Sequence, residues 1–365
     1  MRTRGDAGAV PEHGGDIYGI ARELGKTPEE LLDFSANINP LGFPPGLPAA
    51  LTAALAEVVH YPDRRCTALR EELAASHGLS PEQILVGNGS TELIYLLPRA
   101  LRPRRGLVVA PAFGEYEKAL RAAGAEVRWH HTAEADGFTL SEPLDPGEAE
   151  LVFLANPASP SGALVPSERL AEVVQSLGSR GAMVVLDEAF IDFVEEASLK
   201  SKLARVPHLL ILRSFTKFFG IPGIRLGYLL GAPDLIAQVG AVQEPWSVST
   251  LAQAAGRACL ADRDFMARSR KLVQAARERL FQQLADLPGL TVFPSAANYL
   301  LLKLNAPALT AANLRRKLLA RGLIIRDASN FPGLDARFVR VAVRRPEEND
   351  RLVAALAEIL EEAGQ

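Results

Sequence analysis

The sequence predicts an α/β fold in which a large domain with a mostly parallel, seven-stranded sheet lies between an N-terminal arm and a small C-terminal α+β domain. Three observations predict this arrangement. Short apolar runs alternate with amphipathic helical patterns, which is typical of parallel strands covered by helices on both faces. The chain has 365 residues, 48% of them hydrophobic, which is enough for two domains. After Pro288 the pattern changes to that of a smaller unit.

The expected arm comprises residues 1–47, which are rich in Gly, Pro and Asn and therefore mostly irregular. One helical pattern interrupts it, at Ile17–Leu24. Two further helices are expected before the first strand, at Pro48–Val59 and Cys66–His77, and Gly78 ends the second of them.

The expected large domain, residues 48–265, is defined by strands that are continuously apolar, as strands buried on both faces are. The expected strands are Ile84–Val86, Gly106–Ala110, Glu126–Trp129, Glu150–Ala155, Ala182–Leu186, Leu209–Leu212 and Leu226–Leu230, and the expected helices between them are Thr91–Leu101, Gly114–Ala123 and Ser167–Leu177.

A long helical region, Ser249–Leu284, leads into the expected small domain, residues 266–365. Gly256 and the charged cluster Asp262–Asp264 suggest a break or bend, and the domain boundary is expected within this region. The small domain is expected to contain strands at Tyr299–Lys303 and Phe338–Val343 and helices at Asn313–Arg321 and Glu347–Ala363.

The composition disfavours several classes of protein. The net charge is −3 and there is no long basic run, so neither nucleic acid nor an acidic membrane is an expected partner. No segment approaches the roughly 20 apolar residues needed to span a bilayer, and the polar stretch Met1–Val10 does not resemble a secretory signal. Cys66 and Cys259 lie far apart and no histidine has zinc-type spacing, so we expect reduced thiols, a cytoplasmic location and no metal.

The stretch most suggestive of chemistry runs from Arg213 to Gly220, directly after a buried strand. It is mostly apolar but contains Ser214, Thr216 and Lys217, and Arg225 follows shortly after it. A lysine in apolar surroundings has a lowered pKa and can form a Schiff base, while hydroxyl groups and a guanidinium suit a phosphate. The alternative is a surface loop with solvated charges.

Asp187 stands at the end of another buried strand. In α/β sheets, ligands bind at the carboxyl ends of the strands. A carboxylate in this position can hold a pyridinium nitrogen in its protonated form, which makes the ring an electron sink. A helix cap is the alternative, but Lys217, about 30 positions later, favours the ligand-binding role.

The segment Gly87–Glu92 lies between a strand and a helix. Backbone N–H groups at a helix N-terminus bind phosphate, and Ser90 and Thr91 add hydroxyl groups. Glu92 replaces the last glycine of a dinucleotide-binding fingerprint, which disfavours a Rossmann-type site. An ordinary helix cap is the alternative.

A Pro-rich turn, Asn156–Gly162, follows the strand that ends at Ala155. It holds Asn156 at the carboxyl end of that strand, where an amide can donate to a ring oxygen. A plain turn is the alternative.

The order of these features is more informative than any one of them. A phosphate loop, an aromatic residue after a strand, an Asn-Pro turn, a strand-end Asp and a Ser-x-x-Lys segment with a downstream Arg resemble the fold-type I pyridoxal-phosphate (PLP) enzymes of the class I/II aminotransferase family, over nearly the whole chain. The resemblance implies that PLP forms an imine with Lys217, that Asp187 pairs with the ring nitrogen, that Asn156 contacts the ring hydroxyl and that Phe113 stacks on the ring. It also implies a phosphate site made of Gly89, Ser90, Thr91, Ser214, Thr216 and Arg225.

Tyr61 resembles the tyrosine that, in this family, reaches the phosphate from the neighbouring subunit, which implies a homodimer. The chain departs from the family at two places. The usual Asn-Pro-Asn-Asn-Pro-Thr-Gly turn is here Asn-Pro-Ala-Ser-Pro-Ser-Gly, although the anchoring Asn156 is kept. Phe190 stands where many members carry a tyrosine that donates to the ring oxygen, which disfavours efficient ordinary transamination.

Within this family, four segments resemble the threonine-phosphate decarboxylases of cobalamin biosynthesis, with the histidinol-phosphate aminotransferases as near relatives. The His-Gly-Gly start of the arm discriminates most. The segments are His13–Asp16, Asp33–Gly42, Asp187–Phe193 and Pro245–Val248. The implied reaction is the decarboxylation of O-phospho-L-threonine to an aminopropanol phosphate.

Arg326 and Arg340 both have apolar neighbours in the sequence. A buried guanidinium needs an anionic partner, which is either an internal carboxylate or a substrate with two anionic groups. The resemblance implies that both arginines contact phosphothreonine, and either could take its carboxylate or its phosphate. The other implied substrate contacts are His13, Gly14, Asn37, Asn88 and Asn156.

Decarboxylation and transamination differ in which bond at Cα stands perpendicular to the cofactor ring, so the protein chooses by orienting the substrate. An aminotransferase acting on a phosphorylated amino acid such as histidinol phosphate is therefore the main alternative. A regulator with a PLP-type fold is disfavoured because only a short arm precedes the fold, and a nucleotide-binding dehydrogenase because the glycine pattern is incomplete.

Overall fold

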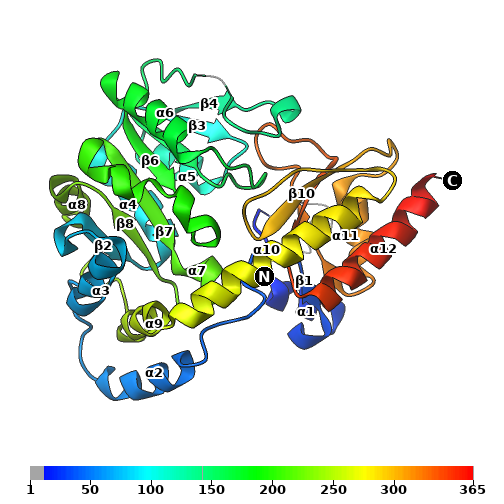
Figure 1. The fold of residues 1–365 in the computed structure, drawn as a ribbon, viewed down its shortest axis with the longest axis horizontal. Coiled ribbons are helices and arrows are strands. Elements are labelled where there is room, and N and C mark those ends of the chain that lie inside the picture. The colour runs from blue at the N-terminus through cyan, green and yellow to red at the C-terminus, as the bar shows by residue number, and fades with distance from the viewer. Residues whose placement is uncertain (1–11, 142, 365) are drawn as a thin grey trace, which may run out of the picture.

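The computed structural model describes residues 12–141 and 143–364 (Figure 1). A seven-stranded sheet with its helices forms one part of the molecule, and a four-stranded sheet with its helices forms the other. The long helix α10 (Arg263–Ala285) runs from the first part across to the second (Figure 1). The predicted α/β fold and the predicted change of architecture after residue 288 are both confirmed.

The large sheet has the strand order β2-β8-β7-β6-β5-β3-β4. Its pairs are parallel from β4 to β7, whereas β8 runs antiparallel to both β7 and β2. The mostly parallel seven-stranded sheet is therefore confirmed. The strands are β2 (Ile84–Gly87), β3 (Arg105–Ala110), β4 (Glu126–His131), β5 (Leu151–Ala155), β6 (Met183–Asp187), β7 (Leu209–Ser214) and β8 (Gly227–Leu230).

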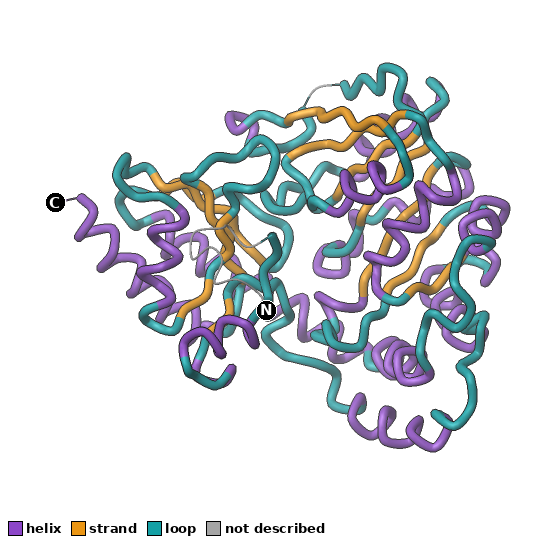
Figure 2. The backbone as a smooth tube through the Cα atoms, turned by 180° about the vertical axis from the view of Figure 1, so that it is seen from behind, coloured by secondary structure: helices purple, strands orange, loops and turns teal. Residues whose placement is uncertain are grey.

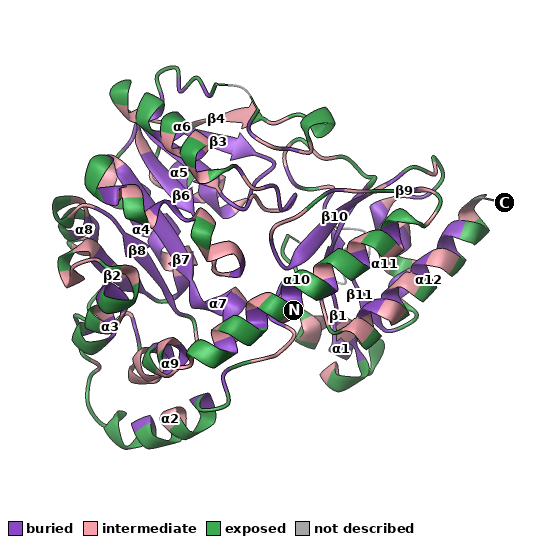
Figure 3. Cartoon of the chain, in the orientation of Figure 1, coloured by how far each residue is buried: buried purple, intermediate pink, exposed green. Residues whose placement is uncertain are grey.

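The central strands are buried because helices cover both faces of the sheet (Figure 3). Successive residues of a strand point to opposite faces. In β6, Val184 and Leu186 pack in one hydrophobic cluster, while Val185 packs in another. The first cluster is covered by α3 (Thr67–His77), α6 (Ser167–Ser179) and α9 (Thr250–Ala261), and the second by α4 (Gly89–Leu101), α5 (Glu115–Ala122) and α8 (Pro233–Gly240).

The long helical region predicted from Ser249 to Leu284 is two helices, and the break falls at Asp262. Its backbone is not helical (φ −93°, ψ 79°), and its side chain accepts from the Phe265 amide at 2.8 Å, which caps α10. The suggestion that Gly256 also breaks the helix is wrong, since Gly256 lies inside α9. A Cβ at Gly256 would stand 2.7 Å from the Leu226 side chain, so this glycine serves close packing.

The smaller part is built on an antiparallel sheet with the order β12-β13-β10-β9. The arm is tied to this part because β1 (Leu32–Asp33) pairs in parallel with β11 (Leu323–Ile324), which the sequence did not predict. The four strands are β9 (Leu290–Val292), β10 (Tyr299–Leu304), β12 (Arg326–Asp327) and β13 (Phe338–Ala342), and the helices are α1 (Ile17–Leu24), α11 (Ala311–Leu319) and α12 (Pro346–Gly364).

Helix α10 contributes to both hydrophobic cores. Phe265 and Val273 pack in the core of the large sheet, and Ala276, Leu280 and Leu284 pack in the core of the small one. Figure 2 shows the two groups of strands from behind, with helices between and around them. The boundary that we propose between residues 265 and 266 lies near the start of this shared helix.

The remaining elements are short. Helix α2 (Leu47–Ala54) lies on the outside of the molecule and is largely exposed (Figure 3), and α7 (Phe215–Phe218) follows β7 directly. Among the described residues, no helix has the length and the apolar character that crossing a membrane requires. The 3-10 helices are Pro28–Glu30, Leu55–Glu57, Pro81–Gln83, Glu134–Asp136, Ile191–Ala197 and Leu199–Arg205.

Candidate active site

A cavity of about 500 Å³ lies at the carboxyl ends of β5, β6 and β7. The small sheet and the arm close it on the other side, because residues of β12, β13 and the arm also line it. Most of the predicted site residues meet here. Those that line the cavity are His13, Gly14, Asn37, Ser90, Thr91, Phe113, Asp187, Ser214, Thr216, Lys217, Arg225, Arg326 and Arg340.

Lys217 lies in the short helix α7 and lines the cavity. Burial, together with the positive charges of Arg340 and Arg225, lowers the pKa of its amine to about 8. The backbone is fixed as well, since the Asn39 amide donates to the Lys217 carbonyl at 3.0 Å. The backbone that carries the amine is therefore held in place, and with a pKa of about 8 roughly a tenth of the amine is unprotonated and nucleophilic at pH 7.

Asp187 ends β6 and is buried. Tyr116, which the sequence reading missed, donates its hydroxyl to Asp187 Oδ2 at 2.6 Å, and the Ala189 amide donates to Oδ1 at 2.8 Å. Burial raises the pKa of this carboxyl, whereas the two hydrogen bonds act to lower it. Tyr116 is itself held by stacking on Phe153, with ring centroids 5.0 Å apart. Asp187 is thus a rigidly held acceptor at the edge of the sheet.

The N-terminus of α4 and Arg225 together form a cradle for an anion. Gly89 has φ +78°, and a Cβ there would stand 2.6 Å from Arg225 Nη2, so glycine lets the guanidinium approach. Arg225 itself adopts φ +60°, an unusual conformation for a residue with a side chain. A Cβ at Gly227 would stand 2.5 Å from the Ser90 amide.

Hydroxyl groups complete this cradle. Ser90, Thr91 and Thr216 line the cavity beside Arg225, and Ser214 Oγ accepts from the Thr216 amide at 3.3 Å and so caps α7. Free N–H groups at a helix N-terminus, hydroxyls and one guanidinium are the donors that a phosphate monoester takes. The residues present therefore fit the phosphate of PLP, and their role in binding it stays a prediction.

Four predicted residues do not line the cavity. Gly89 only shapes the cradle, and Asn88 is exposed, with its backbone N–H donating to Glu92 Oε2 at 2.6 Å. Asn156 is buried, and its side chain makes two hydrogen bonds to the backbone of Val165. Oδ1 accepts from the Val165 N–H at 2.8 Å, and Nδ2 donates to the Val165 carbonyl at 3.1 Å. One Nδ2 proton of Asn156 remains for a ligand.

Tyr61 lies outside the cavity of its own chain. It is 79% exposed and stacks on Trp246, with ring centroids 4.5 Å apart. It borders a separate groove formed by α2, α3 and α9. Tyr61 therefore does not act on the cavity of its own chain in this structure, and its contact with a neighbouring subunit stays a prediction.

Arg326 and Arg340 are neighbours on the paired strands β12 and β13, and both are buried. Arg340 donates to Ser159 Oγ and to the Ser35 carbonyl, each at 3.2 Å, and lies 5.2 Å above the Tyr299 ring. Its Nε has no hydrogen-bond partner, and it forms no ion pair with any carboxylate of the described residues. Burial lowers its pKa to about 10.

Arg326 donates through Nη2 to the Glu12 carbonyl at 2.8 Å and to Asn330 Oδ1 at 2.7 Å. Burial lowers its pKa to about 10, and the charge of Arg340 acts in the same direction. The two arginines are neighbours on the same wall of the cavity and repel each other, and an anion bound between them would reduce that repulsion. This pair suits a ligand with more than one negative charge.

The arm brings its predicted residues to the same place. Asn37 is buried, and in the described part of the chain its Oδ1 has no hydrogen-bond partner. A Cβ at Gly14 would stand 2.3 Å from the Ser35 carbonyl, so only glycine allows the arm to pack this closely. His13 Nε2 forms a hydrogen bond with Glu115 Oε1 at 2.9 Å. Glu115 is another residue that was not predicted from the sequence.

Comparisons with known proteins identify the family of this chain. A family model described as aminotransferase class I and II matches residues 29–356. The chain is 41% identical to a threonine-phosphate decarboxylase of Salmonella typhimurium, over 95% of this chain and 96% of that one. It is 35% identical to a histidinol-phosphate aminotransferase of Methanothermobacter thermautotrophicus, over 95% of this chain and 94% of that one.

Solved structures show the same likeness. The L-threonine-O-3-phosphate decarboxylase of Porphyromonas gingivalis superimposes with a TM-score of 0.82 at 31% identity, covering 90% of this chain and 99% of that one. The histidinol-phosphate aminotransferase of Clostridium acetobutylicum superimposes with a TM-score of 0.85 at 28% identity, covering 91% and 100%. The predicted resemblance is confirmed, and the chain belongs to the class I and II aminotransferase family.

Proposed function

We propose that this protein is a PLP-dependent decarboxylase that converts O-phospho-L-threonine to (R)-1-amino-2-propanol O-phosphate. Relatives at 41% and 38% identity bear the name threonine-phosphate decarboxylase, the second as putative. A relative at 31% identity is named an adenosylcobalamin biosynthesis bifunctional protein, which supports a place in cobalamin biosynthesis. The structural observation that carries the proposal is the pair of buried arginines, Arg326 and Arg340, on one wall of the cavity.

PLP, when bound, supplies an electron sink for the charge that remains at Cα after a bond breaks. Lys217 would hold its aldehyde carbon, Asp187 its ring nitrogen and Phe113 the face of its ring. The cradle of Gly89, Ser90, Thr91, Ser214, Thr216 and Arg225 would hold its phosphate.

The protein's own residues choose the reaction by orienting the substrate. Arg326 and Arg340 take the two anionic groups of phosphothreonine, which fixes the substrate at both ends and leaves its Cα facing Lys217. The Lys217 amine, with its pKa near 8, can return a proton to Cα once the carboxylate has left. His13, Gly14 and Asn37, which line the cavity, are the further substrate contacts that we propose. The predicted contacts of Asn88 and Asn156 stay predictions, because neither residue lines the cavity.

Phe190 also favours decarboxylation. It lines the cavity and packs edge-on against Tyr299, with ring centroids 4.9 Å apart. A phenyl ring cannot donate to the oxygen of the cofactor ring, so the donor that many aminotransferases use is absent at this position.

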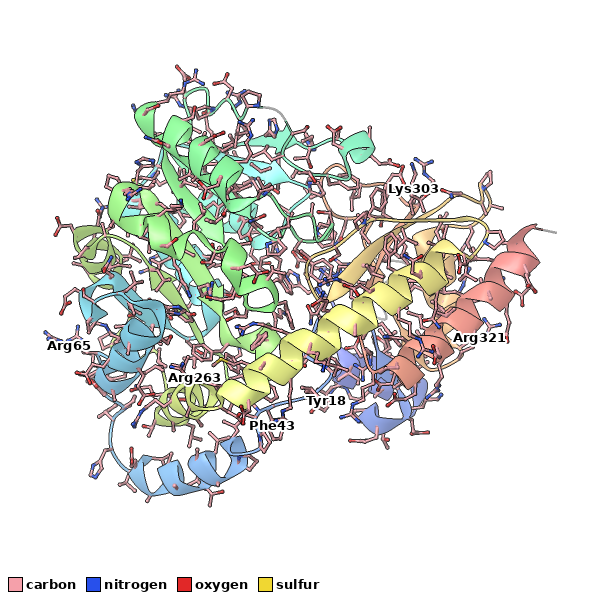
Figure 4. All side chains as sticks on the ribbon, viewed as in Figure 1. Tyr18, Phe43, Arg65, Arg263, Lys303 and Arg321 are labelled. Carbon is pink, nitrogen blue, oxygen red and sulfur yellow. The ribbon has the colours of Figure 1, made fainter. Side chains whose placement is uncertain are left out.

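We propose further that the protein is a cytoplasmic homodimer in which Tyr61 reaches the phosphate site of the partner subunit. Tyr61 belongs to an unusually apolar exposed region that includes Val59 and Trp246, which are 78% and 47% exposed. Phe43, labelled in Figure 4, lies on the same side of the molecule as α2 and is 49% exposed. Apolar area of this kind on a soluble protein usually marks an interface.

The test supplies O-phospho-L-threonine as the sole substrate and measures released CO2. The proposal expects CO2 without any amino acceptor and expects none from the Lys217→Ala variant. The alternative is a histidinol-phosphate type of aminotransferase, which the relatives and the Clostridium structure support. Keto product that appears only when 2-oxoglutarate is added, without CO2, would overturn the decarboxylase proposal.

A further inference from the structure

Glu115 stands at the meeting point of the arm and the large sheet. It begins helix α5, and its side chain is only 10% exposed. Among the residues that the structure describes, its carboxylate has three hydrogen-bond partners, which are His13 Nε2 at 2.9 Å, the Tyr95 hydroxyl at 2.7 Å and Lys118 Nζ at 3.0 Å. An acid in the first turn of a helix is favoured by the helix dipole alone, but that effect does not require partners from two other segments.

Several contacts hold the start of the arm at the cavity, and Glu115 makes one of them. Arg326 donates to the Glu12 carbonyl at 2.8 Å, and within the arm the Gly15 amide donates to Ser35 Oγ at 2.9 Å. Glu12 also pairs with Lys118, so the ammonium of Lys118 lies between the carboxylates of Glu12 and Glu115.

His13 is the arm side chain that Glu115 fixes. Its ring packs at a tilt against Phe113, with centroids 5.5 Å apart, and lines the cavity. Because a carboxylate oxygen accepts from Nε2, the ring carries a proton on that nitrogen. Nδ1 is then the ring nitrogen available to a ligand, and His13 directly follows Glu12, whose carbonyl accepts from Arg326.

We propose that Glu115 is a positioning residue for the substrate site, which holds the His13 ring in one orientation and tautomer over the mouth of the cavity. Glu115 does not touch the substrate. It acts through His13, which then completes the anion-binding surface begun by Arg326 and Arg340. This inference rests on the proposed function, because it takes a phosphorylated amino acid as the ligand that the arm covers.

An alternative role of the same residues is a cation site. The candidate ligand atoms of Glu12, His13 and Glu115 lie within 4.8 Å of one another. Lys118 already supplies a positive charge to both carboxylates, so a second cation there would meet repulsion.

The test compares Glu115→Ala, His13→Ala and the double variant with the wild-type holoenzyme, using CO2 release from O-phospho-L-threonine. Each single change should raise KM about 10-fold, the size of one lost charge-assisted hydrogen bond, and change kcat less than about 3-fold. The double variant should be no more than about 2-fold worse than either single one, because both changes remove the same interaction. An additive effect of about 100-fold would overturn the proposal.

Three further variants separate positioning from folding. Glu115→Gln keeps an oxygen acceptor for His13 and should recover part of the lost KM. Tyr95→Phe removes another bond of Glu115 but leaves His13 in place, so a KM close to wild type is expected; a loss as large as that of Glu115→Ala would show a packing role instead. Glu168→Gln, in a remote exposed ion pair with Lys202, is the matched control.

The cofactor absorbance of each variant checks that it is folded and loaded. If the wild-type enzyme releases no CO2 but transaminates histidinol phosphate, the proposed function fails while the inference about Glu115 can still be tested. The same variants are then compared for KM with histidinol phosphate at saturating 2-oxoglutarate. Unchanged KM values in Glu115→Ala with either substrate would overturn the inference alone.

Discussion

The hydrogen bond from Tyr116 to Asp187 offers the sharpest test of how the site controls its charge. Tyr116→Phe removes one oxygen atom and leaves the ring stacked on Phe153. The lost bond is 2.6 Å long, buried, and made to a carboxylate. Such a bond contributes about 1.5–3 kcal/mol to the ionised form. Ionisation of Asp187 therefore becomes less favourable by about 10- to 150-fold in equilibrium constant.

The consequence should appear in the pH dependence of kcat. The pKa of Asp187 is already raised by burial, and losing Tyr116 raises it further, so the neutral acid persists to higher pH. The acidic limb of the kcat profile should move to higher pH, and kcat near neutrality should fall by about 10-fold or more. Steady-state CO2 release across the pH range measures both quantities.

Tyr228→Phe is the matched control. Tyr228 is also buried, and its hydroxyl bonds His77 Nε2 at 2.8 Å. Burial lowers the pKa of His77 to about 3, so this hydrogen bond joins two neutral groups near pH 7 and lies away from Asp187. A Tyr116→Phe enzyme with the acidic limb and kcat of wild type, within about 2-fold, would refute the role given to Tyr116.

Three other predictions concern single residues. Arg340→Leu should raise KM for O-phospho-L-threonine by about 100-fold, and a KM near wild type would contradict the role given to Arg340. Thermal unfolding of this variant should show equal or greater stability, because the buried guanidinium has no ion pair in the described structure. The rate at which cofactor-free protein takes up PLP, followed by absorbance, should increase with pH around a midpoint near 8, because only the unprotonated Lys217 amine reacts. A midpoint near 10.5 would contradict the lowered pKa. The free energy of unfolding, measured with denaturant, should decrease as pH falls from 6.5 towards 3, because His77 stays neutral in the folded protein but gains a proton in the unfolded chain. His77→Gln should weaken this pH dependence, and an unchanged pH dependence in the variant would contradict the prediction.

The fold could be predicted because apolar runs and amphipathic patterns report burial directly. The strands of the large sheet differ from their predicted ranges by one or two residues at their ends. The pairing of β1 with β11 could not be predicted, since two residues carry no periodic pattern. Gly256 was misread because sequence alone cannot distinguish a glycine that breaks a helix from one that lets two helices approach.

The candidate site was predictable where motifs place residues at strand ends. Asp187 ends β6, Lys217 follows β7, and Arg225 precedes the antiparallel strand β8, so the topology brings all three to the same edge of the sheet. Tyr116 and Glu115 were missed because they read as the first turn of an ordinary helix, and their roles depend on β6 and the arm. Phe113, which was predicted as a site residue, could have pointed to Glu115 and Tyr116, since the residues directly after it lie at the same edge of the sheet.

The shared helix α10 has a consequence for motion. Asn39 donates to the Phe218 carbonyl at 2.6 Å and to Ser269 Oγ of α10 at 2.8 Å, so the segment carrying Lys217 is clamped to the first half of this helix. The strands that carry Arg326 and Arg340 pack on its second half through the small core. Helix α10 therefore connects the segment that carries the reacting amine to the sheet that carries the two arginines, and its straightness bears on the distance between them. A substitution that kinks α10 would alter the width of the cavity, and with it the choice of bond, without touching any residue that contacts a ligand.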